Sequence, residues 1–393
     1  MRRTTFAVAL AAALFSAESH ASRWNWSNNI EFTAKTALEK PSTADELATL
    51  IRDTRRSVKV VGTAHSFNDI ADTDGIQISL ANFQNISIDP SRMMVKFGGG
   101  VTYISLIKAL AAEKMALQNL PSLPHINVVG SVVTGTHGSG MQNQAMGALV
   151  SEFAFVDASG AQRRLTREHH EGEFYRYLHS FGALGVIYEM TMDIEPEYGV
   201  AKCVYQDVPW DFLKDKEAYN ELNQRHEYIS YFTDWKEEKM TSIWIGSRYN
   251  PQNISYEDLL AQSYLDTCPP TYLEGTLTQK IHPVPGRSSD PCVESGYGMW
   301  NDKIYHFKPD KPPSSDGDEI QTEFFVKYAD MPAAVAELYS NAALFRDFVQ
   351  ITEIRGVERD SIPLSPAKEQ DVMGIHFTWK HDFKNVYFAA KTV

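Results

Sequence analysis

The sequence predicts an α+β protein made of two parts that differ in character. In the first part, short β-branched runs alternate with stretches of helical spacing, which is typical of an α/β or α+β domain. In the second part, strand-like runs follow one another with a single helix among them, which indicates an antiparallel sheet with helical cover. The change falls near residues 197–203. A chain of 393 residues usually forms two domains or one large composite.

The first 21 residues read as an export signal. Met1-Arg2-Arg3 is a charged start, Phe6 to Phe15 is an apolar run, and Ser19-His20-Ala21 has the small residues of a cleavage site. Such a run is too short to span a bilayer, which needs about 20 residues. We therefore expect residues 1–21 to be a cleaved signal peptide and the protein to be secreted or periplasmic. The alternative is an ordinary buried helix.

Elements of the first part follow from local patterns. Thr43-Ala44-Asp45-Glu46 has the spacing of a capping box, and the apolar residues after it recur at helical intervals, which predicts a helix over 43–56. Residues 58–61 then form a strand that enters a loop. The other elements expected here are strands at 76–80, 93–97 and 186–194, helices at 104–111 and 174–181, and a hairpin of 153–156 with 164–166.

The second part is dominated by strands. The pattern predicts one helix over 332–341, and long surface loops over 250–318, where Pro, Gly and Ser are frequent. The strands expected here are 228–235, 241–248, 320–327, 349–355 and 372–380.

The loop after residue 61 is a candidate cofactor site. The run Val60-Val61 ends at Gly62, and Thr63, Ala64, His65 and Ser66 follow. Successive backbone N–H groups at a strand end form a concavity that holds an anion such as a pyrophosphate. An imidazole placed there can act as a nucleophile towards a bound cofactor. The alternative is a polar turn with one surface histidine.

A glycine-rich segment at residues 120–140 favours the cofactor. Glycine allows the main chain to approach a ligand closely, and hydroxyls beside it can donate to phosphate oxygens. The segment is neither a Walker A loop nor a Gly-x-Gly-x-x-Gly fingerprint, so it favours a phosphate-bearing cofactor other than NAD or ATP. Its small residues are Gly130, Ser131, Thr134, Gly135, Thr136, Gly138, Ser139 and Gly140.

Two strands of the second part carry polar side chains in phase. Because successive side chains of a strand alternate between faces, Glu353 and Arg355 share one face. His376, Thr378 and Lys380 likewise share one face of their strand. Such a face is exposed to solvent or lines a polar cavity.

Composition excludes some functions. A net charge of −13 and a pI near 5.4 argue against nucleic-acid binding, which needs a basic surface. The sequence contains no cluster typical of a zinc site, so we expect no metal. Of the cysteines Cys203, Cys268 and Cys292, one is left over, and Cys268 and Cys292 could pair within one Pro-rich stretch.

Seven segments of the chain occur in the order in which one known family has them: 25–30, 62–70, 120–140, 182–186, 232–235, 353–355 and 376–380. In these segments the chain resembles the FAD-dependent alditol oxidases, which are xylitol/sorbitol oxidase-like flavoenzymes of the vanillyl-alcohol-oxidase-type superfamily. The resemblance implies a two-part PCMH-type FAD-binding domain at 25–198 and a substrate-binding domain at 199–393. The family continues past the strand at 376–380 with an Arg-Pro-His-Trp-Gly-Lys segment that has no counterpart here, so we expect a shortened substrate domain.

The resemblance also implies roles for particular residues. FAD is attached covalently through His65, His376 is the base, Arg355 favours the developing alkoxide, and Glu353 accepts hydrogen bonds from substrate hydroxyls. Thr378 adds a polar contact to the substrate, and Ser122 touches both substrate and flavin. The remaining FAD contacts are Val60, Val61, Gly62, Thr63, Ala64, Ser66, Asn127, Gly130, Thr134, Gly135, Thr136, His137 and Val186.

The activity implied is oxidation of a sugar alcohol by hydride transfer to flavin N5, with O2 as the electron acceptor and H2O2 as product. One alternative is a sugar-1,4-lactone oxidase or dehydrogenase. Another, of a different class, is a flavin- or carbohydrate-binding protein without turnover. The expected partners are a polyol and O2, with no nucleic acid and no membrane; the sequence leaves the oligomeric state open.

Overall fold

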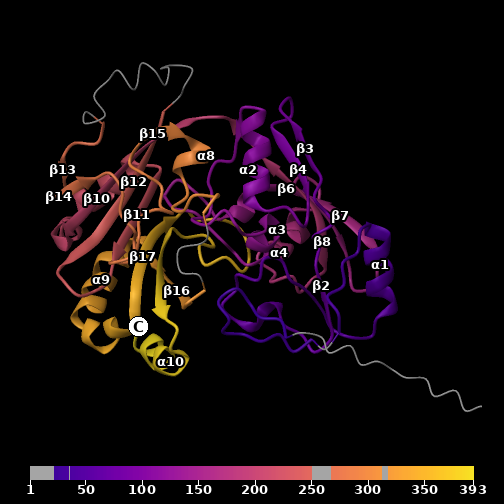
Figure 1. The fold of residues 1–393 in the computed structure, drawn as a ribbon. Coiled ribbons are helices and arrows are strands. Elements are labelled where there is room, and N and C mark those ends of the chain that lie inside the picture. Colours follow the sequence, from indigo (N-terminus) through magenta and orange to yellow (C-terminus); the bar gives the residue numbers. More distant parts are fainter. Residues whose placement is uncertain (1–21, 35, 250–266, 312–316) are drawn as a thin grey trace, which may run out of the picture.

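The structure is a computed structural model that describes residues 22–34, 36–249, 267–311 and 317–393. Its described residues form two main sheets, one of five strands and one of nine, which lie next to each other (Figure 1). Helices pack on both sheets, so the predicted α+β class is confirmed. The proposed leader at 1–21 lies outside the described residues.

The five-stranded sheet belongs to the first part and is antiparallel. A core of buried side chains joins it to the helices α2 Tyr103–Ala112, α3 Val128–Val133 and α4 Glu171–Tyr177. The strands predicted at 93–97 and 186–194 and the predicted hairpin are confirmed. In spatial order the strands are β3 Ile86–Asp89, β4 Met94–Gly98, β8 Val186–Asp193, β6 Val150–Val156 and β7 Gln162–Thr166.

A parallel pair of short strands precedes that sheet and carries the His65 loop. The helix α1 Ala44–Asp53 begins as predicted, with the Thr43 hydroxyl accepting from the amide of Glu46 at 3.1 Å. The Glu46 carboxylate accepts from the amide of Ser42 rather than Thr43, at 2.7 Å. The other elements here are β1 Val58–Val60, β2 Ile76–Ile78, η1 Asp69–Ala71, η2 Met146–Leu149, and the pair β5 Met115–Ala116 with β9 Glu195–Pro196.

The helix predicted at 174–181 is wrong in its position. It begins earlier, at Glu171, and ends at Tyr177, after which His179 and Phe181 adopt φ of 57° and 55°. The amide of His179 donates to the carbonyl of Val132 at 3.3 Å. The amide of Phe181 donates in the same way to the end of α3. The chain therefore turns to satisfy carbonyls of another helix instead of extending its own.

The nine-stranded sheet fills the second part and confirms the strands predicted there. The domain boundary proposed at 198/199 falls between β9 and β10, and it stays a prediction. In spatial order the strands are β13 Thr271–Tyr272, β14 Gly275–Thr278, β10 Gly199–Pro209, β12 Lys239–Tyr249, β11 Tyr228–Thr233, β17 Val349–Val357, β18 Val372–Lys380 and β16 Glu319–Lys327, with β15 Gly296–Met299 also paired to β10.

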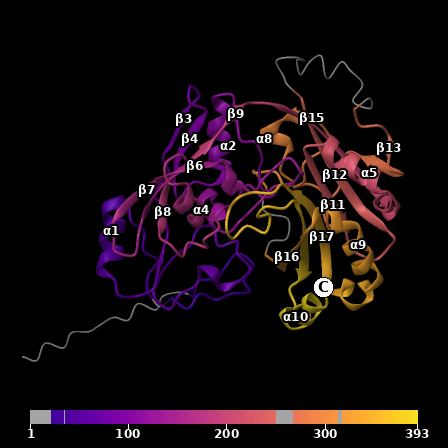
Figure 2. The same cartoon turned by 180° about the vertical axis from the view of Figure 1, so that it is seen from behind.

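Helices cover one face of this sheet and leave the other turned towards the first part (Figures 1 and 2). The predicted helix at 332–341 is confirmed as α9 Met331–Ser340. Apolar side chains such as Ile354, Ile375 and Phe377 point to the covered face, so alternate residues of the same strands point to the uncovered one. The other helical segments of this part are η3 Trp210–Lys214, α5 Lys216–Arg225, α8 Trp300–Lys303, η4 Tyr328–Asp330, η5 Ala342–Leu344, η6 Arg346–Phe348 and α10 Phe383–Thr392.

The prediction of surface loops over 250–318 is wrong for the part that the structure describes. Residues 267–311 contain β13, β14, β15 and α8, and Trp300 and His306 are buried. The apolar side chains of Trp300, Ile304 and Tyr305 join the core of the first part. Burying these apolar side chains stabilises a packed structure, so this stretch is ordered in the core although Pro and Gly are frequent in it.

The cysteine pairing considered from the sequence is also wrong. Cys203 and Cys268 form a disulfide with 5.5 Å between their Cα atoms, and Cys292 is free and buried. Cys203 lies on the helix-covered face of β10, whereas Cys292 packs with Val204 on the opposite face. The alternation of β10 therefore separates Cys292 from the other two.

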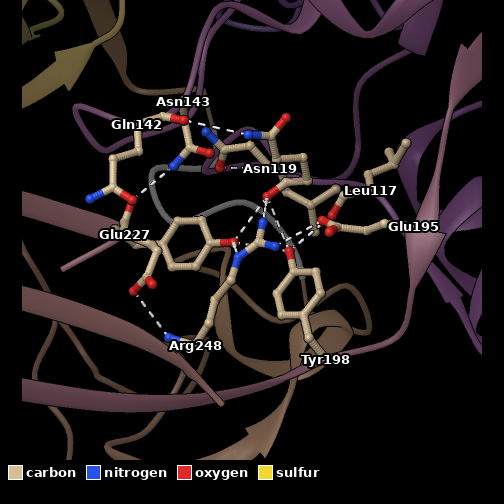
Figure 3. A network of polar contacts seen from close by, with 11 residues as sticks. Leu117, Asn119, Gln142, Asn143, Glu195, Tyr198, Glu227 and Arg248 are labelled. Atoms are coloured by element: carbon tan, nitrogen blue, oxygen red, sulfur yellow. Dashed lines mark hydrogen bonds and ion pairs between the residues drawn. The ribbon is translucent and has the colours of Figure 1, made fainter. Parts of the chain in front are cut away.

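A network around Arg248 ties the two parts together (Figure 3). The guanidinium lies over the ring of Tyr198, with its carbon 3.7 Å from the ring centroid. It donates to the hydroxyl of Tyr228 at 2.8 Å and to Glu195 at 2.9 Å. The Tyr198 hydroxyl donates to the carbonyl of Leu117 at 2.9 Å. These contacts hold the segment that leads to residue 122.

Candidate active site between the two sheets

A cavity of about 730 Å³ lies where the two parts meet, and residues of both parts line it. Val186 is the one predicted site residue outside it: its side chain packs beside Leu47, and its neighbours Gly185 and Ile187 line the cavity instead. The predicted site residues that line the cavity are Val60, Val61, Gly62, Thr63, Ala64, His65, Ser66, Ser122, Asn127, Gly130, Thr134, Gly135, Thr136, His137, Glu353, Arg355, His376 and Thr378.

The loop 62–66 presents its main chain to the cavity. The amides of these residues donate to no group in the described part of the chain, whereas the preceding amide, of Val61, donates to β2 at 2.9 Å. Side chains of the N-terminal segment hold the loop from behind. Asn25 donates to the carbonyl of Ser66 at 2.9 Å, and Asn29 donates to that of Phe67 at 3.0 Å. The loop is thus fixed with free donors, which suits an anionic ligand.

His65 is held as a neutral imidazole at the cavity wall. Its ring stacks on Trp26 with 4.7 Å between centroids and 26° between planes. Burial, with a smaller contribution from His125, lowers the pKa of His65 to about 4. At neutral pH the ring therefore keeps a lone pair on one nitrogen, as a nucleophile requires.

The start of α3 supplies a second set of groups to the cavity. The Oδ1 atom of Asn127 is buried and has no hydrogen-bond partner among the described residues. Gly62 approaches this side chain so closely that a Cβ would lie 2.3 Å from Oδ1. At Gly130 a Cβ would meet only the Asn127 side chain, at 3.7 Å. Glycine at position 62 thus lets the His65 loop approach the Asn127 side chain closely, and Asn127 keeps an unused polar atom in the lining of the cavity.

Across the cavity, three adjacent strands form a wall of polar side chains. In the central strand β18, His376 lies directly opposite Glu323 of β16 and Glu353 of β17. Thr378, two residues on, lies opposite Gln321 of β16. The alternation predicted from the sequence therefore points these side chains to one cavity. Lys380 does not join them: its side chain lies outside the cavity lining and donates to a main-chain carbonyl of η6 at 2.6 Å.

Arg355 is the central cation of this wall. It donates to the Ser122 hydroxyl at 3.0 Å and lies 3.5 Å from Glu323 and 3.6 Å from Glu353. Burial disfavours the charged form of Glu353, but Arg355 and the nearby histidines outweigh it and hold the pKa of Glu353 below its ordinary value. The carboxylate is therefore ionised at neutral pH and can accept hydrogen bonds from hydroxyl groups.

His306 belongs to the wall but was not singled out from the sequence. Its Nδ1 lies 3.5 Å from Glu353, its Nε2 lies 3.2 Å from the Ser230 hydroxyl, and its amide donates to the carbonyl of Ser122 at 3.1 Å. Burial lowers the pKa of His306 to about 3, so the ring is neutral. Its surroundings in the sequence carry no period, and no local signal identifies it.

Glu323 connects the wall to the glycine-rich segment. His137 places Nε2 3.1 Å from the Glu323 carboxylate and Nδ1 2.8 Å from the carbonyl of Gly138. His137 therefore bridges the Glu323 carboxylate and the main chain of the glycine-rich segment. Burial opposes ionisation of Glu323, but His137 and then Arg355 outweigh it and lower its pKa well below the ordinary value. The alternation of side chains along a strand, which identified Glu353 as a site residue, could also have identified Glu323 on β16.

Comparison with known proteins places an FAD-binding region in the first part of the chain. Residues 36–166 match the family model described as an FAD binding domain. The chain is 33% identical to an alditol oxidase of Streptomyces over 367 residues, which cover 92% of this chain and 83% of that protein. The chain belongs to the alditol oxidase family. The predicted family membership is thereby confirmed.

Two other proteins are similar to this chain to a lesser degree. An L-gulono-1,4-lactone dehydrogenase of Mycobacterium tuberculosis is 32% identical over 178 residues, which cover 44% of this chain and 41% of that protein. A crystal structure of cholesterol oxidase from B. sterolicum superposes with a TM-score of 0.67 at 14% identity, covering 91% of this chain and 79% of that one. The second likeness shows that the fold is shared.

The cofactor of this family member is FAD, and the cavity fits it. The free amides of 62–66 offer donors for a pyrophosphate, and the buried Oδ1 of Asn127 lacks the partner that a bound dinucleotide would provide.

Over the described ranges, no three histidine, cysteine or acidic side chains are grouped to hold a metal ion. Within those ranges, no helix has both the length and the apolar character needed to cross a membrane.

Proposed function

We propose that this protein oxidises a sugar alcohol with FAD, passes the electrons to O2 and releases H2O2. The observation that carries the proposal is the polar wall, which faces the FAD loops across one cavity. A polyol offers only hydroxyl groups, so its recognition needs several donors and acceptors at fixed positions. Two ionised carboxylates, a guanidinium, imidazoles and a hydroxyl supply them within one sheet face.

Five residues that line the cavity have defined parts in this proposal. Bound FAD supplies the hydride acceptor. His376 takes the proton of the reacting hydroxyl, and burial lowers its pKa, which keeps the ring neutral and able to accept that proton. Arg355 binds the same oxygen and stabilises its developing negative charge. Glu353 accepts from further hydroxyls, while Ser122 and Thr378 add neutral polar contacts.

We further propose that FAD is bound covalently through His65. The neutral imidazole at the cavity wall and the stacked Trp26 support this assignment. A nitrogen lone pair is available for the bond, and the stacking fixes the ring. If the linkage exists, unfolded and filtered protein keeps its visible flavin spectrum, and His65→Ala loses it on unfolding. Flavin released from unfolded wild-type protein would contradict the linkage while leaving FAD binding intact.

We also propose that the protein is exported, with residues 1–21 as the leader. The disulfide Cys203–Cys268 supports this, because disulfides persist in oxidising compartments. Sequencing the N-terminus of protein recovered from the culture medium or periplasm tests the proposal. Retention of the full leader in the cytosol would contradict it.

A substrate panel tests the main proposal. We expect the purified holoenzyme to release H2O2 with xylitol or sorbitol and to be slower with gulonolactone. A lactone oxidase or dehydrogenase is the second candidate, favoured by the similarity to the lactone dehydrogenase, which covers 44% of this chain. Faster reduction of FAD by gulonolactone would establish that candidate. FAD that stays oxidised with every polyol and lactone would leave only a binding protein.

A further inference from the structure

A chain of hydrogen bonds leads away from His376 along β16. The Nε2 atom of His376 lies 2.9 Å from Oε1 of Gln321. The Nε2 amide of Gln321 in turn donates to the Glu319 carboxylate at 2.5 Å. Glu319 is buried with 5% of its surface exposed, and all three side chains line the cavity. Neither Glu319 nor Gln321 has a part in the mechanism described above.

Counting donors along this chain fixes the proton on His376. A carboxylate can only accept, so Glu319 faces the NH2 end of Gln321. The carbonyl end of Gln321 therefore faces His376, and a carbonyl can also only accept. Nε2 of His376 must then carry a hydrogen. In a neutral imidazole the other nitrogen, Nδ1, is left with its lone pair.

The surroundings of His376 do not fix the tautomer by themselves. Carboxylates face it from both sides, Glu323 on β16 and Glu353 on β17, and Arg355 and His137 lie beyond them. These charges act on the ring as a whole, and none of these four side chains forms a hydrogen bond with it in the part of the chain that the structure describes. In the described part of the chain, the bond to Gln321 is the one hydrogen bond of the ring.

We propose that Glu319 and Gln321 are positioning residues that hold His376 in its Nε2–H tautomer, which makes Nδ1 the atom that receives the substrate proton. The inference rests on the proposed role of His376 as base. In that step the substrate O–H bond breaks and an Nδ1–H bond forms, while the electron pair of the C–H bond leaves as hydride to FAD. The other tautomer would present an N–H to the hydroxyl and could not accept its proton.

The test is Gln321→Leu in the holoenzyme, read by 15N NMR of labelled histidine side chains. In the wild type we expect a pyridine-like signal from Nδ1 of His376, assigned by its loss in His376→Ala. In Gln321→Leu the preference of His376 for the Nε2–H tautomer should disappear. The rate of flavin reduction should fall about 10- to 100-fold, which is part of the roughly 10²–10⁴-fold acceleration that a positioned base supplies. The acidic limb of kcat/KM moves to lower pH, because an acceptor that stabilised the imidazolium is gone.

Two further variants make the outcome decisive. Glu319→Gln allows the Gln321 amide to rotate, so it should move the tautomer and the pH profile in the same direction by a smaller amount. Gln350→Leu is the matched control, because Gln350 also bridges strands but lies outside the cavity. It should leave both readouts unchanged.

A pyridine-like Nε2 in the wild type would overturn the inference. So would a tautomer and a pH profile that neither cavity variant changes. The NMR readout needs no turnover. If the protein shows the expected tautomer but oxidises no polyol, the proposed function is rejected, while the inferred positioning of His376 by Gln321 and Glu319 still holds.

Discussion

Arg355 shows how a single residue organises the charges of the cavity. It contacts the Ser122 hydroxyl and lies within 3.6 Å of two carboxylates, Glu353 of its own strand β17 and Glu323 of β16. Removing one partner of a buried ion pair leaves an uncompensated charge, which costs more than the pair contributes. The same guanidinium therefore serves both the folded state and the proposed chemistry.

Arg355→Lys should reduce kcat/KM for the best polyol by about 10²-fold, comparable with the loss of one electrostatic donor in other enzymes. A lysine carries one ammonium and cannot meet three partners from the positions of a planar fork. Stopped-flow reduction of the holoenzyme measures the effect. Arg167→Lys, which alters an ion pair with Asp193 away from the cavity, is the control and should be neutral. Equal rates in the Arg355→Lys variant and the wild type would remove Arg355 from the mechanism.

At the scale of elements, strand alternation predicted more of the site than motifs alone could. Glu353, Arg355, His376 and Thr378 were placed on shared faces from the sequence, and all line the cavity. Gln321 and Glu323 obey the same alternation, but a period does not say which face meets a cavity. That depends on β16 pairing with β18, a contact between residues about fifty positions apart that no local pattern reports.

Other errors have the same origin in long-range contacts. The helix predicted at 174–181 stops early because amides after Tyr177 bond to α3. His306 enters the wall because β15 and α8 pack on β10 and bring the following residues inward. The strands, in contrast, were predicted because each is a short run rich in β-branched and aromatic residues, which is a local signal.

The N-terminal clamp on the His65 loop gives a prediction at this scale. Asn25 donates to the Ser66 carbonyl and accepts from the amides of Asn29 and Ile30, both at 3.0 Å. Asn25→Ala should destabilise the clamp by about 1–3 kcal/mol, since buried groups lose their partners. We expect a smaller fraction of purified protein to carry flavin, measured from the ratio of visible to ultraviolet absorbance. Asn82→Ala, a matched change outside the cavity lining, should leave that fraction unchanged. Full flavin content in Asn25→Ala would show that the clamp is dispensable.

At the scale of the whole molecule, the cavity exists because two separately packed sheets meet there. Neither part encloses it alone: the loops of the first part supply one wall, and the uncovered face of the large sheet supplies the other. The Arg248 network and the residues around α8 hold the parts in register (Figure 3). Buried histidines lie on both sides of this junction, so folding and protonation are linked across the molecule.

Stability should therefore fall as the pH is lowered below neutral. Burial lowers the pKa of His179, His226 and His282 to about 4 and that of His306 to about 3. In the unfolded chain a histidine titrates near pH 6.5. Between pH 6.5 and 4 the unfolded state thus binds protons that the folded state excludes. Each such histidine contributes up to about 1.4 kcal/mol per pH unit to the slope of unfolding free energy.

Urea unfolding of the holoenzyme at pH 7, 6 and 5 measures that slope. His306→Asn should reduce the slope of unfolding free energy against pH by up to about 1.4 kcal/mol per pH unit, which corresponds to one proton. The reason is that the variant has no ring to protonate at this buried position. His169→Gln is the matched control at an exposed position, since the His169 side chain is 69% exposed. The carboxylates of Glu323 and Glu353, whose pKa values are lowered, add a further loss only below about pH 4.3, the ordinary range for glutamate. An unfolding free energy that stays constant from pH 7 to 5 would mean that these histidines are accessible to protons in the folded protein.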